Sequence, residues 1–201
     1  MSLQQLKDDA RYTYADYCKW DDHFRCELIR GVIYVDGQPF DGQPPIAAMM
    51  APAPLWGHQK ISGELYRQLA NFLKGKPCKI FHPPFDVRLN VDSEDDTTVQ
   101  PDLVVICDQS KLSGTGCKGV PDMVIEVLSP STARQDRVVK FNLYGQAGVR
   151  EYWIVDPDSK TVQICILEDG RYFATAFSDT GTAPVRVLPG CEIDLHEVFA
   201  E

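Results

Sequence analysis

The chain has 201 residues, of which 44% are hydrophobic, and its 20 basic and 29 acidic residues give a formal net charge of −9. This length suits one substantial core but is short for two, so we expect a single domain over residues 1–201. A pI near 4.9 argues against a protein that coats DNA indiscriminately, because basic contacts to phosphate supply most non-specific affinity, but it does not exclude a nuclease whose metal ions cancel local acidic charge.

The chain lacks the features of membrane and disulfide-rich proteins. No stretch approaches the roughly 18 uncharged apolar residues of a membrane span, and residues 1–11 are polar and mixed in charge rather than signal-like. We therefore expect a cytoplasmic protein without membrane association. The seven cysteines include no C-x-x-C pair, which argues against a disulfide framework and a thiolate zinc site. Reduced thiols are the expectation, with Cys107 and Cys165 acting as small hydrophobes in strand-like runs.

The N-terminal part of the chain predicts a β-hairpin followed by a loop. Residues up to about 22 favour helix, and residues 27–35 have the pattern of two short strands around a turn at Arg30-Gly31. Many Gly and Pro residues then indicate a loop or an arm over residues 36–57.

A long amphipathic helix is expected next. From residue 58 to residue 74 apolar side chains recur at spacings of three and four, which indicates one buried face, and Gly75 would end the helix. Gly63 costs about 1 kcal/mol relative to alanine within a helix. Its presence predicts that another backbone approaches closely there.

Strands dominate the rest of the chain. Three are expected at residues 80–89, 103–107 and 123–128, and the last two are apolar almost throughout, as is typical of strands covered on both faces. Thr132 and Gln135 form a capping-box pattern that predicts a helix closed by Gly148. Turn signals then separate the strands of an antiparallel meander, expected at 151–155, 162–167 and 171–177.

The most informative single residue is Glu126, an acid inside the apolar run Val124 to Leu128. An ionised carboxylate buried there needs a cation, hydrogen-bond donors or a proton, because leaving it unpaired costs several kcal/mol. A structural ion pair with a lysine or arginine would satisfy it. A functional site is the other interpretation, since perturbed carboxylates gather at such sites.

Two further acids are candidates for a partner of Glu126. Asp122 shares its strand face but lies four residues away, about 13 Å at 3.3 Å per residue. Asp102 begins a separate strand, and strands about 4.8 Å apart bring opposing side chains together. We therefore expect Asp102 to lie beside Glu126, although Pro101-Asp102 is also an ordinary way to start a strand.

The helix after the Glu126 strand supplies basic residues. Lys140 lies among apolar neighbours, with Asp136 and Tyr144 one turn away on the same helix face. A short connection from strand to helix would carry this lysine back over the end of the strand. Arg134 and Arg137 could bind phosphate, while solvent exposure is the more ordinary role for such helix charges.

A family pattern is carried by several blocks: Glu27 to Gly31, His58, Pro84 to Leu89, Gln100 to Val105, Pro121 to Thr132, Lys140, Tyr144 and Gly148 to Pro157. With these residues the chain resembles the PD-(D/E)XK superfamily of restriction endonuclease-like enzymes, and within it the Uma-type endonucleases. The resemblance covers most of the chain. It implies an α/β fold with a mixed central β-sheet flanked by helices, here with an N-terminal hairpin and a C-terminal antiparallel meander.

The resemblance also assigns roles to residues. It implies that Asp102 and Glu126 bind a metal ion and that Lys140 supplies positive charge. The superfamily pattern places its lysine two residues after the acid, where this chain has Leu128, so Lys140 would be a lysine relocated to the helix. Glu64 resembles an additional helical acid of the superfamily, and an exposed surface role fits it equally well.

The leading hypothesis is hydrolysis of a DNA phosphodiester. Asp102, Glu126 and the backbone carbonyl of Val127 would bind Mg²⁺, with Mn²⁺ as an alternative, and Lys140 would orient the attacking water or stabilise the transition state. His58 and Tyr144 are further candidates for the site, and a structural role at the start of its helix is the alternative for His58. Cleavage of both strands would favour a homodimer. A non-catalytic module that binds DNA or protein is the competing hypothesis, and a nuclease acting on RNA or branched DNA would use the same chemistry.

Overall fold

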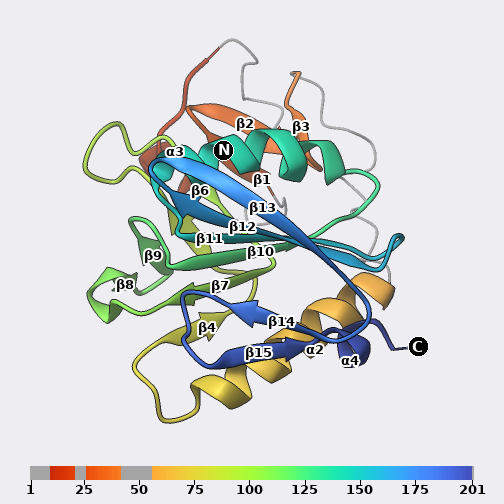
Figure 1. Ribbon diagram of the computed structural model, residues 1–201. Coiled ribbons are helices and arrows are strands. Elements are labelled where there is room, and N and C mark those ends of the chain that lie inside the picture. The colour runs from red at the N-terminus through yellow and green to blue at the C-terminus, as the bar shows by residue number, and fades with distance from the viewer. Residues whose placement is uncertain (1–9, 21–25, 42–55, 201) are drawn as a thin grey trace.

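The computed structural model describes residues 10–20, 26–41 and 56–200 (Figure 1). Most of the expected arm at residues 36–57 lies outside these ranges. Within them, none of the helices is both long enough and apolar enough to cross a membrane.

The predicted N-terminal hairpin is confirmed. A short helix, α1 (Tyr14–Tyr17), precedes β1 (Cys26–Ile29) and β2 (Val32–Val35), and β3 (Gln38–Pro39) pairs with β2. Arg30 and Gly31 form the turn with φ values of 52° and 75°. Glycine adopts such left-handed angles without steric cost, which explains its place in the turn.

Two mixed sheets make up the body of the molecule. The seven-stranded sheet has the order β3-β2-β1-β6-β5-β9-β8, with β5 (Asp86–Arg88), β6 (Thr98–Val99), β8 (Leu112–Ser113) and β9 (Gly116–Lys118). The six-stranded sheet has the order β13-β12-β11-β10-β7-β4, with β4 (Lys79–Phe81), β7 (Leu103–Ile106), β10 (Met123–Val127), β11 (Glu151–Asp156), β12 (Thr161–Glu168) and β13 (Arg171–Ser178). Only β10 and β11 run parallel in the six-stranded sheet, and β11 to β13 form the predicted antiparallel meander.

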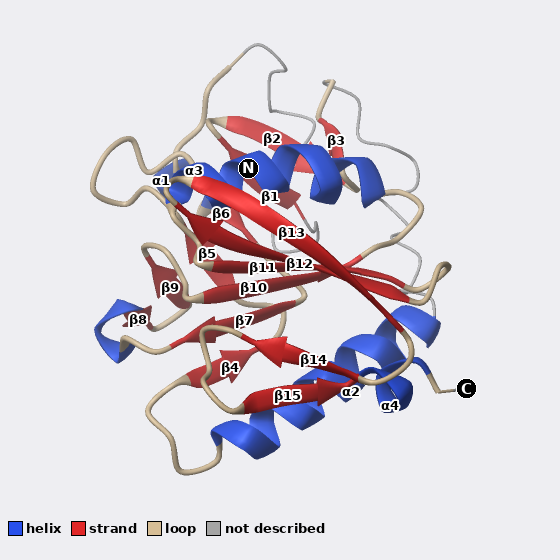
Figure 2. Cartoon of the chain, in the orientation of Figure 1, coloured by secondary structure: helices blue, strands red, loops and turns tan. Residues whose placement is uncertain are grey.

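Helices cover the two faces of the six-stranded sheet (Figure 2). On one face lie α2 (Trp56–Leu73), α4 (Leu195–Phe199) and the hairpin of β14 (Thr182–Val185) and β15 (Cys191–Asp194), packed on Leu103, Ile125 and Trp153. On the other lies α3 (Phe141–Ala147), packed with the seven-stranded sheet on Val104, Val124 and Ile154. Residues of β7 and β10 with even numbers therefore face α3 and the seven-stranded sheet.

The amphipathic helix is confirmed as α2, which buries Ile61, Leu65, Leu69 and Leu73. The expectation at Gly63 was wrong. A methyl group added there would meet no atom within 4 Å outside the immediate chain, so no close backbone approach explains this glycine.

The single strand expected at residues 80–89 was also wrong. The segment forms β4 in one sheet and β5 in the other. Pro83 and Pro84 lie between them, and proline cannot donate a ladder hydrogen bond, so the strand ends where they begin.

The helix after β10 ends as predicted but starts differently. Gly148 closes α3 with a φ of 94°. The expected capping box was wrong, because the side chain of Gln135 donates to Glu27 Oε2 at 3.0 Å instead. Residues Gln135–Lys140 form a π-helix, η4, that leads directly into α3.

One pair of cysteines contradicts the expectation of reduced thiols. Cys78 and Cys107 form a disulfide. They directly extend the antiparallel pairing of Lys79 with Ile106 between β4 and β7, so the ladder sets their sulfur atoms side by side. The other five cysteines are free.

Candidate functional site

The geometry of β7 and β10 brings two acids together. Ile125 pairs with Leu103 in the antiparallel ladder, so the next residues along it, Glu126 and Asp102, lie opposite each other on one sheet face. Glu126 is only 4% exposed, and the Asp102 side chain is 19% exposed. Asp122 lies elsewhere, with its carboxylate bound to the N–H of Cys107 at 2.6 Å.

Lys140 reaches Glu126 from the helical segment that follows β10. Its Nζ lies 2.9 Å from Glu126 Oε1 and 2.9 Å from Glu27 Oε1. A third carboxylate, that of Asp136, lies 3.4 Å away on the same segment. A fully buried ammonium requires such charge-assisted partners, because burial without them costs several kcal/mol. Lys140 therefore does lie beside the acid of β10.

Two buried tyrosines hold the surrounding groups. The Tyr144 hydroxyl donates to Glu126 Oε1 at 2.9 Å, so this oxygen receives both an ammonium and a hydroxyl hydrogen bond. The Tyr152 hydroxyl donates to the backbone carbonyl of Asp136 at 3.0 Å. Both rings are fully buried and pack edge to face with centroids 4.9 Å apart, which fixes Tyr144 against the sheet.

The turn between β2 and β3 packs closely against the backbone at the start of the helical segment. A Cβ atom at Gly37, whose φ is 77°, would lie 2.7 Å from the carbonyl oxygen of Ser131 and 2.9 Å from Thr132 Cα. Only glycine permits both that backbone conformation and that approach. The π-helical turns that follow end at Lys140, and π-helical segments often occur at functional sites.

Glu27 was missed as a site residue. Its Oε1 accepts the backbone N–H of Gln100 at 3.0 Å and lies 2.9 Å from Lys140 Nζ, while Oε2 accepts from Gln135. The signal was present, because Glu27 is an acid between Cys26 and Leu28 in a strand-like run. What the pattern lacked was the packing of the hairpin against the helix.

The cluster carries excess negative charge. Burial raises the pKa of Glu126 well above its usual value, and Asp136, Asp102 and Glu27 raise it further, against the opposing effect of Lys140. Burial alone would lower the pKa of Lys140, but the contacting carboxylates raise it well above its usual value. Lys140 therefore stays charged, while burial favours the protonated form of Glu126.

Asp102 is held by two groups from different elements. Its Oδ2 accepts the backbone N–H of Val127 at 2.8 Å and lies 3.2 Å from Nε2 of His58, in the first turn of α2. The candidate His58 is thereby placed beside the predicted acid. The backbone N–H of Val127 contacts the Asp102 carboxylate. The role of the Val127 carbonyl as a metal ligand stays a prediction.

The remaining candidates have other partners. Glu64 accepts hydrogen bonds from Arg67 Nε at 2.8 Å and Gln68 Nε2 at 3.0 Å on its own helix. Arg137 pairs with Asp156 at 2.7 Å, and Arg134 is exposed. Their proposed roles remain predictions.

The metal-binding capacity of the described residues is modest. No group of three or more His, Cys, Asp or Glu side chains within them is arranged to hold a metal ion unaided. A magnesium site does not need one, because Mg²⁺ commonly takes one or two carboxylates and keeps several waters.

A mixed sheet carrying these facing acids, with helices on both faces, is the architecture of restriction endonuclease-like proteins. Residues 14–196 match the family model described as "Uma2: Putative restriction endonuclease". The chain belongs to this Uma2 family.

Two relatives complete the comparison. The chain is 33% identical over 126 residues to "Uncharacterized protein slr1290" of Synechocystis sp. (strain ATCC 27184 / PCC 6803 / Kazusa), a match that spans 62% of this chain and 63% of that protein. The fold is similar to the crystal structure of "a putative nuclease belonging to DUF820" from Anabaena variabilis ATCC 29413, with a TM-score of 0.70 and 18% identity, over 94% of this chain and 98% of the other. Together with the family match, this supports a nuclease-like protein.

Proposed function

We propose that the protein is a metal-dependent endonuclease that hydrolyses DNA phosphodiester bonds. One observation carries the proposal: Glu126 and Asp102 face each other across β10 and β7 while Lys140 lies 2.9 Å from Glu126. Two carboxylates and a lysine are the groups needed to bind a divalent cation and to stabilise a phosphate undergoing attack. Membership in the Uma2 family supports the same class of reaction.

The charge and donor chemistry of the cluster fit a hard divalent cation. Three carboxylates, from Glu27, Glu126 and Asp136, contact the ammonium of Lys140, and a fourth, that of Asp102, faces Glu126. This surplus of negative charge and oxygen donors suits Mg²⁺ or Mn²⁺. Asp102, Glu126 and the Val127 carbonyl are the proposed ligands.

Different residues of the site would have different roles in the proposed reaction. A bound cation would lower the pKa of a water molecule and neutralise charge on the phosphate. Tyr144 and Lys140 hold the Glu126 carboxylate in place, and Val127 N–H and His58 hold that of Asp102. Lys140 is also the charge available to orient a water or to stabilise the transition state.

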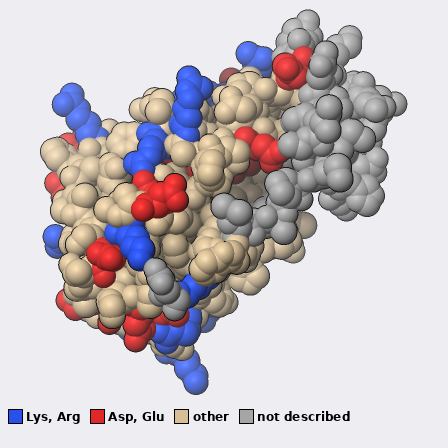
Figure 3. Space-filling model, turned by 90° about the vertical axis from the view of Figure 1, so that its right-hand side faces the viewer, with Lys and Arg blue, Asp and Glu red and all other residues tan. Residues whose placement is uncertain are grey.

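Approach of the DNA depends on local rather than net charge. Acidic and basic side chains are interspersed on the coloured part of the face in Figure 3, without a continuous basic tract across it. We therefore assign phosphate contacts to individual residues, Arg134 and Arg137, of which Arg137 would exchange Asp156 for phosphate. Affinity should be moderate and should fall with increasing salt.

The test is cleavage of supercoiled plasmid DNA with Mg²⁺, with Mn²⁺ and with EDTA. Glu126→Gln keeps the shape of the side chain but removes its charge, so we expect it to abolish cleavage while the fold persists. Glu192→Gln, on the exposed side of β15, is the matched control and should cleave as the wild type does. Equal cleavage by the Glu126→Gln variant would overturn the proposal.

A non-catalytic module that binds DNA or protein is the second candidate. It is favoured by the contacts of Lys140, which already neutralise part of the Glu126 and Glu27 charge without any metal. Calorimetric titration with Mg²⁺ or Mn²⁺ separates the two candidates, because a non-catalytic module should show no metal binding that depends on Asp102 and Glu126. Parallel assays with RNA and branched DNA define the substrate.

A further inference from the structure

The edges of the two sheets differ in how they are protected. Exposed strand edges invite pairing with another chain, and proteins usually blunt them with short strands, lysine or proline. At three edges, β3 and β8 have two residues each, and β4 has three including Lys79. The fourth edge, β13, has eight residues without lysine or proline.

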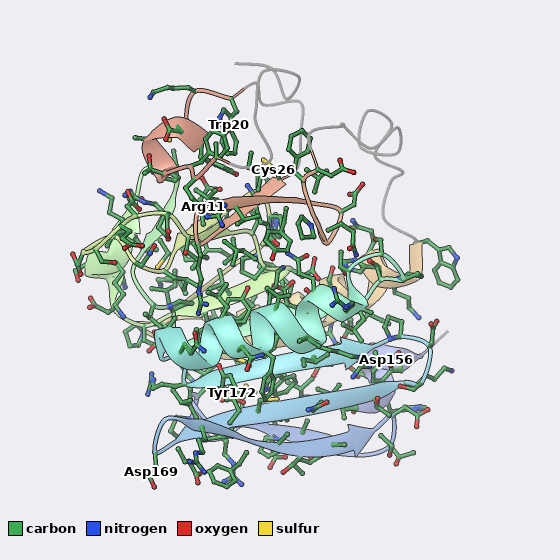
Figure 4. All side chains as sticks on the ribbon, turned by 90° about the horizontal axis from the view of Figure 1, so that it is seen from above. Arg11, Trp20, Cys26, Asp156, Asp169 and Tyr172 are labelled. Carbon is green, nitrogen blue, oxygen red and sulfur yellow. A yellow bond between two sulfur atoms is a disulfide. The ribbon has the colours of Figure 1, made fainter. Side chains whose placement is uncertain are left out.

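The β13 edge is regular as well as long. All eight residues pair with β12 in one continuous antiparallel register, from Arg171 opposite Glu168 to Ser178 opposite Thr161. Within the described ranges no strand pairs with its other side. Figure 4 shows the β12–β13 hairpin, with Asp169 at its turn, at the outer margin of the molecule.

Side chains near both ends of β13 contact the rest of the protein, whereas the residues between them are exposed to solvent. The Tyr172 hydroxyl donates to the carbonyl of Val149 at 2.8 Å, and Phe177 packs on the α2 side of the core. Between them Phe173 is 59% exposed, and the three residues that follow it are also exposed. The edge is therefore held in an extended conformation and needs little ordering before it pairs.

We infer that β13 pairs antiparallel with β13 of a second copy, joining two six-stranded sheets into one. A two-fold axis perpendicular to the sheet keeps each face on its own side, so odd-numbered residues must meet odd-numbered residues. A symmetric pair of this kind satisfies the backbone groups of both free edges at once. The inference does not depend on the nuclease proposal.

Charge and side-chain size select one register, with Thr175 on the axis. This register places Phe173 opposite Phe177 of the second copy, and Arg171 opposite Asp179 of the second copy, the residue that follows β13. Cross-strand pairs of both kinds are stabilising. A shift of the register by two residues in one direction places Asp169 opposite Asp179 of the second copy, a repulsive pair of like charges. A shift in the other direction places Phe173 opposite Asp179 of the second copy and loses the contact between phenylalanines.

The first test is the oligomeric state of the full chain, measured by sedimentation velocity over a range of concentrations. We expect a dimer whose dissociation constant rises at least ~10-fold in Phe173→Lys, because the substitution removes an apolar contact twice and places a charge in it. Val138→Lys is the matched control, since Val138 is also an exposed apolar residue, 52% exposed. A monomeric wild type, or a dimer indifferent to Phe173→Lys, overturns the inference.

The second test addresses the register and does not need a destabilised variant. In a Cys18→Ser background, which removes the exposed free thiol, Thr175→Cys should form a disulfide-linked dimer on mild oxidation. Directly opposed residues of an antiparallel pair have Cα atoms about 4.5–5.5 Å apart, within the range of about 4.4–6.8 Å that a disulfide spans. Ser178→Cys, on the same strand but far from the axis, should not link. Equal linking by both variants, or by neither, overturns the register.

Discussion

Asp102 lies directly across the β7–β10 ladder from Glu126, and its carboxylate accepts the backbone N–H of Val127 at 2.8 Å. The aspartate thus has a structural contact as well as a proposed chemical role, and two substitutions separate them. In Asp102→Asn the amide oxygen can still accept this hydrogen bond, so we expect near-normal stability but loss of metal-dependent cleavage. In Asp102→Ala the N–H loses its acceptor, at a cost of about 1–3 kcal/mol.

Urea unfolding and plasmid cleavage measure the two effects on the same samples. Cleavage at the wild-type rate by Asp102→Asn would contradict the assignment of Asp102 as a metal ligand.

Lys140→Met should destabilise the protein in a pH-dependent way. The substitution leaves the Glu126, Glu27 and Asp136 carboxylates without their ammonium, and breaking a buried pair in this way typically costs about 3–5 kcal/mol. Without the ammonium the pKa values of Glu126 and Asp136, which burial already raises, rise further. The folded state then holds more protons than the unfolded state, so the loss of stability should grow as pH rises above the usual carboxyl range and shrink in acid.

Urea unfolding at acidic and at mildly alkaline pH checks this expectation. Lys118→Met, at an exposed lysine, is the control and should show little effect at either pH. A pH-independent effect of Lys140→Met would mean that the carboxylates are not its partners in solution.

Binding of a divalent cation should release protons. Burial raises the pKa of Glu126 and of Asp136, with neighbouring acids adding to the effect, whereas a bound cation favours the ionised carboxylate. Metal affinity should therefore increase with pH until these groups are ionised. Titration calorimetry in two buffers of different ionisation enthalpy measures the proton release, and heats that are independent of the buffer would rule it out.

The Tyr144 hydroxyl should set the pH dependence of cleavage. It donates to Glu126 Oε1, a contact that favours the ionised carboxylate. Tyr144→Phe removes a hydrogen bond to a charged group, of the order of 1.5 kcal/mol, and should shift the acidic limb of the pH–rate profile upward by about one pH unit. Tyr152→Phe is the matched control, because that buried hydroxyl bonds to a backbone carbonyl instead, and an equal shift in both variants would count against the role of Tyr144.

The disulfide is directly testable by counting thiols. Of the seven cysteines, five should react with a thiol reagent in the unfolded, non-reduced protein and all seven after reduction. Closing the loop between Cys78 and Cys107, a separation of 29 residues, should stabilise the fold by about 3–4 kcal/mol in the chain-entropy picture. Cys78→Ala should lose this stability and Cys18→Ser should not, while seven reactive thiols before reduction would show that the bond is absent in solution.

Local patterns in the sequence were sufficient for the long helix, the hairpin, the meander and the central acid pair. The 3.6-residue periodicity of α2 and the apolar runs of β7 and β10 depend only on neighbours in the chain. Glu126 stood out because its own strand is apolar, and the strand spacing pointed to Asp102. The structure places these two residues opposite each other and brings Lys140 and Tyr144 to Glu126.

Features that depend on contacts between distant segments were not accessible. Glu27 joins the cluster only because the hairpin packs on the helix. The side-chain amide of Gln135 donates to Glu27 and so does not form the expected capping box. The disulfide follows from the register of β4 with β7, which no spacing of cysteines encodes. Two prolines divided a segment whose apolar pattern alone indicated one strand.

The position of Lys140 depends on the position of the helix α3 that follows it. Tyr172 of β13 packs on this helix. Its ring atoms lie 3.2 Å from the position that a Cβ atom at Gly145 would take, and its ring centroid lies 5.2 Å from that of Phe141. If the protein is the proposed nuclease, remote substitutions at this contact should therefore weaken cleavage without altering any carboxylate. Variation in the meander would in this way change the proposed activity from outside the site.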